Sequence, residues 1–169
     1  MNRSKRYVIV PFCLMAQGIR AQGIARKFSS SIKPVTDLLM KYDVNIIQMR
    51  CPELYFDGFI RQPCGKDHYD NFHNRKICQQ VAEKEVELMK MLKDHDHEIV
   101  AVLGINFSPS CAVDYLSGRP PNRKKGKGIY IEELDKVMRK EKIYNIPFIG
   151  ISIYRIEETI NALKKVLGG

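Results

Sequence analysis

The sequence lacks several patterns that would have assigned it to a known class of protein. No apolar stretch approaches the roughly 18 residues that a membrane-spanning helix needs, so we expect no transmembrane segment. It contains no G-x-x-x-x-G-K-[ST] phosphate loop and no C-x-x-C pair of the zinc-knuckle type. An aromatic pair of the kind that stacks on RNA bases is also missing.

Acidic residues are scarce relative to basic ones. The 169 residues include 28 Lys and Arg against 19 Asp and Glu, which gives a formal net charge of +9. A surface with this charge attracts anions, whether nucleotides, nucleic acids or acidic metabolites, and charge alone does not choose among them.

The five cysteines do not follow the loop spacings of a secreted disulfide scaffold, and their odd count favours a reducing compartment. The basic N-terminus followed by YVIVPFCLMA imitates a secretory signal. We reject that interpretation, because cleavage would delete a well-patterned strand together with Cys13, and Pro11 interrupts the apolar stretch. The expected location is cytoplasmic.

Short runs rich in Val and Ile alternate with longer amphipathic stretches, which predicts an α/β fold. We expect one domain over residues 1–169, a three-layer sandwich with a mostly parallel, Rossmann-like sheet and helices on both faces. The predicted strands are 6–12, 44–50, 98–105 and 146–151. The predicted helices are 34–41, a long helix marked by Ile77, Val81, Leu88 and Leu92, 131–140, and 156–167.

Two segments interrupt this alternation. Residues 117–128, SGRPPNRKKGKG, combine two prolines and three glycines with five cations, so we expect a mobile basic loop. It is either a solvated linker or a lid that places Arg119, Arg123, Lys124, Lys125 and Lys127 over a phosphate. The second segment is an insertion at about 56–74.

Three cysteines follow three of the predicted strands: Cys13, Cys51 and Cys111. Right-handed crossovers place the carboxyl ends of parallel strands at one edge of a sheet, so these thiols should converge there, as in a three-thiolate metal site. A free cysteine is otherwise most often a small core residue, which is our interpretation of Cys78, inside the long predicted helix. Polar neighbours distinguish the other thiols, because Glu53 follows Cys51 closely and serines precede Cys111.

These residues carry a resemblance that spans the chain from Arg6 to about Tyr154. PFCLMAQG around Cys13, CPE at Cys51 and SPSC at Cys111 resemble the three signature elements of the thiouracil desulfurase family. The chain departs from the commoner form of that family, since its first motif leads into GIRAQG and Ala112 stands where the third motif usually ends in glycine. It therefore looks like a divergent subgroup.

The resemblance implies a 4Fe-4S cluster held by Cys13, Cys51 and Cys111, with one iron left open to bind substrate sulfur. The implied reaction is hydrolysis of a C=S bond with release of sulfide. Glu53 would be the acid/base group, and Ser108 would orient the water or a ring substituent, with Ser110 as a substitute.

The implied substrate is a small thiolated base, nucleoside or nucleotide, which we favour over a nucleic acid. The insertion at 56–74 offers Arg61, Lys66 and His68 as substrate contacts in a pocket that differs from the family's usual one.

Three other interpretations remain open. The insertion could form a zinc site, although with poor spacing, from Cys64, His68, His73 and Cys78. The three strand-end thiols could hold zinc or iron-sulfur in a non-catalytic binding module. Alternatively, Cys111 could be the nucleophile of a transferase, with His68 or His73 as its partner.

Overall fold

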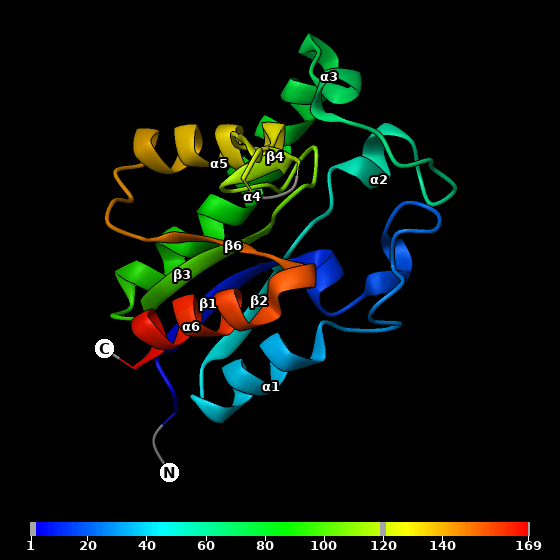
Figure 1. The fold of residues 1–169 in the computed structure, drawn as a ribbon. Coiled ribbons are helices and arrows are strands. Elements are labelled where there is room, and N and C mark those ends of the chain that lie inside the picture. Colours follow the sequence, from blue (N-terminus) through cyan, green and yellow to red (C-terminus); the bar gives the residue numbers. More distant parts are fainter. Residues whose placement is uncertain (1–2, 119–120, 169) are drawn as a thin grey trace.

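The computed structural model describes residues 3–118 and 121–168. Its centre is a sheet of four parallel strands in the order β2-β1-β3-β6 (Figure 1). The strands are β1 (Arg6–Pro11), β2 (Asn45–Met49), β3 (Glu98–Ile105) and β6 (Phe148–Ile151). The predicted Rossmann-like α/β fold is therefore confirmed, and each strand lies within two residues of its predicted bounds.

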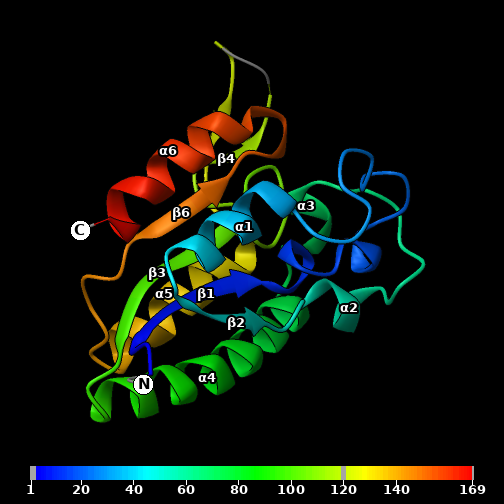
Figure 2. The ribbon, with the colours of Figure 1, turned by 90° about the horizontal axis from the view of Figure 1, so that it is seen from below.

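Helices cover both faces of the sheet, which makes three layers (Figure 2). On one face lie α1 (Lys33–Lys41) and α6 (Ile156–Leu167), and on the other lie α4 (Phe72–Asp94) and α5 (Ile129–Lys140). Asn71 begins the long helix α4 as its N-cap, because its side-chain oxygen accepts a hydrogen bond from the Asn74 amide at 2.9 Å. Within the described ranges, no helix is long and apolar enough to cross a membrane.

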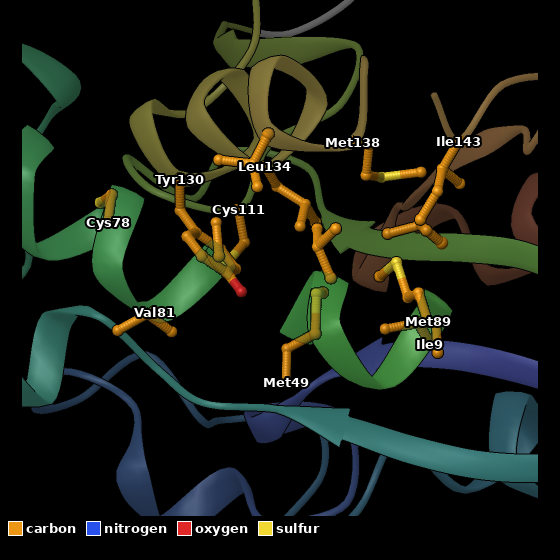
Figure 3. Close-up of a cluster of buried hydrophobic side chains, with 14 of the residues drawn as sticks. Ile9, Met49, Cys78, Val81, Met89, Cys111, Tyr130, Leu134, Met138 and Ile143 are labelled. Carbon is orange, nitrogen blue, oxygen red and sulfur yellow. The ribbon is translucent and has the colours of Figure 1, made fainter. Parts of the chain in front are cut away.

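The alternation of side chains along the strands divides the core into two clusters. Val8 and Val10 of β1 pack toward α1 and α6, whereas Ile9 packs toward α4 and α5. The cluster around Ile9 also contains Tyr130 of α5 and Cys111, so the loop after β3 is anchored in the core (Figure 3). Strand β1 is buried on both faces, which explains its continuous run of apolar residues.

The basic segment 117–128 differs from its predicted form. It begins inside an antiparallel hairpin, in which β4 (Tyr115–Ser117) pairs with β5 (Lys124–Lys125). Arg123 packs its guanidinium over the ring of Tyr115, 4.8 Å from the centroid, a contact that a solvated loop would lack. Arg119 of the predicted lid lies outside the described residues.

A short helix, α2 (Glu53–Phe56), leads into the insertion, which contains a second short helix, α3 (Lys66–Tyr69). In Figure 1 the loop between them lies beside the long loop that follows β1. Two hydrogen bonds join these loops: the Gln22 amide donates to the Arg61 carbonyl at 2.9 Å, and the side chain of Gln62 donates to that of Gln22 at 2.7 Å. The contact closes one side of the carboxyl edge of the sheet.

Candidate functional site

Three thiols meet at the carboxyl edge of the sheet. Cys13 lies in a 3-10 turn directly after β1, Cys51 lies two residues beyond β2, and Cys111 lies six residues beyond β3. Because these strands are neighbours, all three residues line one cavity of about 230 Å³, here called the thiol cavity. The structure thus brings together the three cysteines that the sequence singled out.

Glu53 also lines the thiol cavity, and its two carboxylate oxygens have different partners. Oε1 accepts hydrogen bonds from Ser110 Oγ at 2.5 Å and from Ser108 Oγ at 3.4 Å. Oε2 accepts from Arg61 Nε at 3.1 Å, in an ion pair whose side chains are only 11% and 3% exposed. The three predicted catalytic residues therefore form one hydrogen-bonded group beside the thiols.

The loop that carries Cys111 is fixed by its own serine and by helix α5. Ser108 Oγ accepts hydrogen bonds from the amides of Ser110 at 3.3 Å and Cys111 at 3.0 Å. The amide of Tyr130 donates to the Ser110 carbonyl at 3.0 Å. A Cβ at Gly128 would lie 2.2 Å from the Ser110 carbonyl carbon, so α5 can approach this loop only with glycine there.

Backbone strain marks the same loop. Phe107 lies between β3 and Ser108 with a φ of +71°, a left-handed conformation that is uncommon for a bulky residue. Its amide donates to the Tyr115 carbonyl at 2.8 Å, and its ring lines the thiol cavity. The strained turn therefore places one wall of the cavity.

Burial suppresses ionisation of the three thiols. It raises the pKa of Cys13 to about 12, against the opposing effect of the Arg20 guanidinium, and it raises the pKa of Cys111 well above the ordinary value. Burial and the nearby Glu53 carboxylate also raise the pKa of Cys51. Because metals bind thiolates, occupation of this site by a metal must release protons.

The site does not have the close packing of ligands that a single metal ion requires. Among the described residues, no group of three His, Cys, Asp or Glu side chains could hold one ion. This applies both to the three strand-end cysteines and to the set of Cys64, His68, His73 and Cys78. The ligands of an iron-sulfur cluster bind different irons, so they need wider spacing than those of one ion.

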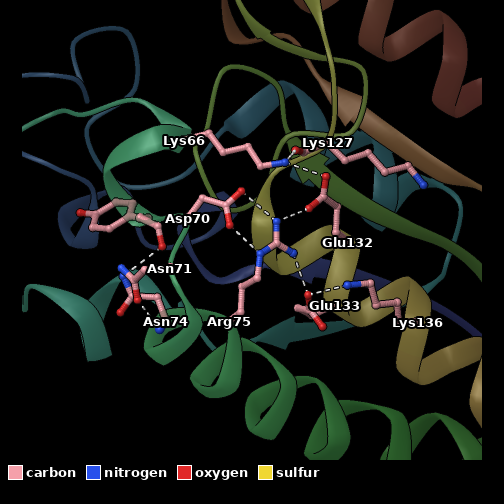
Figure 4. A network of polar contacts seen from close by, with 10 residues as sticks. Lys66, Asp70, Asn71, Asn74, Arg75, Lys127, Glu132, Glu133 and Lys136 are labelled. Carbon is pink, nitrogen blue, oxygen red and sulfur yellow. Dashed lines mark hydrogen bonds and ion pairs between the residues drawn. The ribbon is translucent and has the colours of Figure 1, made fainter.

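The predicted substrate contacts are only partly brought to the cavity. Arg61 lines it, but its guanidinium is engaged by Glu53 and by the Gly58 carbonyl at 3.0 Å. Lys66 instead bonds Glu132 at 2.6 Å, within a network centred on Arg75 (Figure 4). His68 faces Asp57 at 3.5 Å, and neither Lys66 nor His68 lines the cavity.

Sequence reasoning missed much of the cavity wall, including Arg20, Cys64 and Tyr154. A signal for Tyr154 was present, since it follows the fourth parallel strand as Cys111 follows the third. Arg20 donates to the Gln17 side chain at 3.4 Å, and Gln17 in turn donates to the carbonyl of Cys13. Such contacts depend on the path of a loop that has no periodic pattern.

A second cavity of about 960 Å³ adjoins the first, and we call it the arginine cavity. It shares Phe107 and Tyr154 with the thiol cavity and is lined further by Leu116, Ser117, Gly118, Arg123, Ser152 and Arg155. The Nε of Arg123 is buried and has no hydrogen-bond partner among the described residues. A buried donor without an acceptor is unfavourable, and an anionic ligand would satisfy it.

The fold and the site define a Rossmann-like α/β protein with a cavity lined by cysteines at the carboxyl edge of its sheet. The chain is similar to the uncharacterized protein MJ0003 of Methanocaldococcus jannaschii, with 27% identity over 165 residues. The similarity covers 98% of this chain and 96% of that protein. No family model and no solved structure matches the chain.

Proposed function

We propose that this protein is an iron-sulfur-dependent desulfidase, which hydrolyses the C=S bond of a thiolated nucleobase compound and releases sulfide. One observation carries the proposal: three thiols and the Glu53–Ser108–Ser110 group line the same cavity at the carboxyl edge of a parallel sheet. This arrangement supplies soft sulfur ligands and an acid/base group within one site.

The donor set fits a cluster better than it fits one ion. No group of three such side chains among the described residues could hold one ion, whereas Cys13, Cys51 and Cys111 would each bind a separate iron of a 4Fe-4S cluster. When bound, such a cluster offers one iron without a protein ligand as a Lewis acid for the substrate sulfur.

The protein's own residues supply the proton transfers. Glu53 Oε1 takes a proton from the attacking water as the water oxygen bonds to the ring carbon, while Ser108 orients that water. The C–S bond then breaks as the new hydroxyl group becomes a carbonyl: Glu53 returns its proton to the departing sulfur, takes up the hydroxyl proton and passes that one to the hydrosulfide. The balance is C=S plus water to C=O plus hydrogen sulfide, with no oxidant or reductant.

Arg61 positions the carboxylate in this scheme. Its ion pair with Oε2 leaves Oε1 directed at the two serine hydroxyls. Both serines line the cavity, but Ser110 is fully buried and holds Oε1 from the protein side, whereas Ser108 is partly exposed. This difference favours Ser108 as the residue that contacts water or substrate.

Within the substrate class, the arginine cavity favours a nucleotide. A base in the thiol cavity would leave its sugar and phosphate close to Phe107 and Tyr154, which border both cavities. Arg123 and Arg155 line the arginine cavity, where both pair with Glu158, so a phosphate would bind in competition with that carboxylate.

The transferase alternative has less support. Neither His68 nor His73 lines the thiol cavity, so no described histidine there could activate Cys111. Burial raises the pKa of Cys111, whereas a nucleophilic cysteine needs a lowered one.

Anaerobic reconstitution, with iron and sulfide counted per chain, tests the cofactor. Sulfide release is then measured with a thiopyrimidine as free base, nucleoside and nucleotide. The conservative variant Glu53→Gln should keep its cluster absorption but lose about 10²- to 10⁴-fold in rate, because it cannot take up the proton. Activity near wild type in this variant, or a reconstituted chain without iron, would refute the proposal.

A further inference from the structure

Two exposed aromatic residues, Phe107 and Tyr154, line both the thiol cavity and the arginine cavity. Phe107 is 37% exposed and Tyr154 is 70% exposed. Phe107 lies two residues after β3, and Tyr154 lies in the 3-10 turn that follows β6. Because β3 and β6 are neighbours in the sheet, two loops at the same edge contribute aromatic surface where the two cavities adjoin.

The backbone of Phe107 holds an unfavourable conformation, since its φ of +71° is left-handed and its side chain is bulky. Two hydrogen bonds fix this turn: the Phe107 amide donates to the Tyr115 carbonyl at 2.8 Å, and the Ser108 amide donates to the Ile105 carbonyl at 3.1 Å. Phe107 and Tyr154 belong to neither core cluster of the described residues. Backbone strain in an aromatic residue that lines a cavity and packs outside the core is typical of a ligand-binding position.

The next residue along the chain connects each aromatic residue to one part of the proposed site. Ser108 follows Phe107 and donates a hydrogen bond to Glu53 at 3.4 Å in the thiol cavity. Arg155 follows Tyr154 and lines the arginine cavity. A nucleotide that reaches from the acid/base group to the arginines must therefore pass the aromatic surface that the two cavities share.

We propose that Phe107 and Tyr154 form the surface on which the base of the substrate stacks, and that they thereby select a planar aromatic ring. This inference rests on the proposed function for the class of substrate. Stacking uses the flat face of a base and is largely independent of the groups on its edge. The edge that carries the sulfur therefore stays free to face Glu53 and Ser108.

The test is equilibrium dialysis of the full chain with uridine monophosphate, which carries no sulfur and is not turned over. We expect Phe107→Leu and Tyr154→Ala each to weaken binding about tenfold, and Tyr154→Phe to retain it. The matched controls are Phe59→Leu and Tyr144→Ala, since both residues are exposed and neither lines the two cavities. The control variants should bind as wild type does. Unchanged affinity in Phe107→Leu and Tyr154→Ala would overturn the proposal.

Two related compounds distinguish stacking from support of the fold. Dihydrouridine monophosphate keeps the hydrogen-bonding edge of the base but has a puckered, non-aromatic ring, and ribose 5-phosphate has no base. Wild type should bind uridine monophosphate severalfold more tightly than either compound. Tyr154→Ala should lose this preference while its affinity for ribose 5-phosphate stays the same.

An equal loss of affinity for all three compounds would show that Tyr154 only supports the fold, and it would overturn the proposal. A wild type without preference for the planar ring would do the same. A chain that shows the expected preference but releases no sulfide from any thiolated nucleotide would instead overturn the proposed reaction and leave the stacking surface in place.

Discussion

At the scale of single residues, the two carboxylate oxygens of Glu53 have different partners and different roles. Oε2 is held by Arg61 and Oε1 faces two hydroxyls, so the carboxylate has a fixed orientation inside a largely buried site. Arg61 and the two serines therefore hold different oxygens of Glu53. Loss of Arg61 affects folding first, because it leaves a buried charge without its counterion.

We expect Arg61→Gln to lower the free energy of unfolding by about 3 kcal/mol, because both partners of the Arg61–Glu53 pair are almost fully buried. Urea denaturation followed by circular dichroism measures the change. Lys33→Gln is the matched control, since the Lys33–Asp37 pair is exposed and should contribute less than about 1 kcal/mol. Equal effects of the two substitutions would contradict a special contribution of the buried Arg61–Glu53 pair to stability.

Gly128→Ala should be strongly destabilising, by about 2 kcal/mol or more, since the added methyl group would meet the backbone at Ser110. The thermal midpoint, compared with that of Gly18→Ala, measures this effect. Gly18 is exposed and has no heavy atom within 4 Å of a built Cβ, so its substitution should leave the midpoint almost unchanged. A Gly128→Ala variant as stable as Gly18→Ala would show that the contact is not close.

At the scale of elements, periodicity predicted the strands and the four long helices, because each buries a regular face. The convergence of Cys13, Cys51 and Cys111 followed from strand order and crossover handedness. What the sequence did not reveal depends on non-periodic contacts. The hairpin β4–β5 depends on Arg123 packing over Tyr115, and the displacement of Lys66 from the cavity depends on its pairing with Glu132.

Helices α4 and α5 and the segment after α3 are joined by a network around Arg75, which bonds Asp70, Glu132 and Glu133 (Figure 4). Hydrogen bonds from Arg75 lower the pKa of Asp70. Burial raises the pKa of Glu132, but hydrogen bonds from Lys66 and Arg75 outweigh it, and the net shift is downward. Both carboxylates therefore stabilise the fold while ionised.

Because these folded-state pKa values are lowered, their stabilisation is complete above the unfolded values near pH 4 and is lost as the pH falls through the folded values. We expect the free energy of unfolding of the wild type to fall steeply below about pH 4. Arg75→Gln should show a flatter decline over the same range. Parallel pH profiles from urea titrations of the two proteins would contradict this.

At the scale of the whole molecule, a net charge of +9 draws anions toward the surface, and we propose that the arginine cavity binds them. Charge on the surface raises the rate of encounter, whereas arginines within a cavity select the ligand. The two contributions can be separated by experiment, because salt weakens attraction by the surface charge more than it weakens contacts with arginines inside a cavity.

Arg155→Gln should raise KM for a thiolated nucleotide by about tenfold, the loss expected for one charge-assisted contact, and leave KM for the free base unchanged. Steady-state sulfide release with both substrates measures this. Lys93→Gln, at the C-terminal end of α4, is the control that also removes one positive charge. An equal rise in KM for base and nucleotide would show that Arg155 does not contact phosphate.

The order β2-β1-β3-β6 has a consequence for biosynthesis. Strand β1 is made first, but its neighbour β3 and the loop with Cys111 leave the ribosome about ninety residues later, and α5 later still. Until then, Cys13 and Cys51 belong to a nascent chain whose sheet is incomplete, so their thiols are open to oxidants. The thiol cavity can therefore form only late in synthesis, once β3, the loop that carries Cys111 and α5 have all been made.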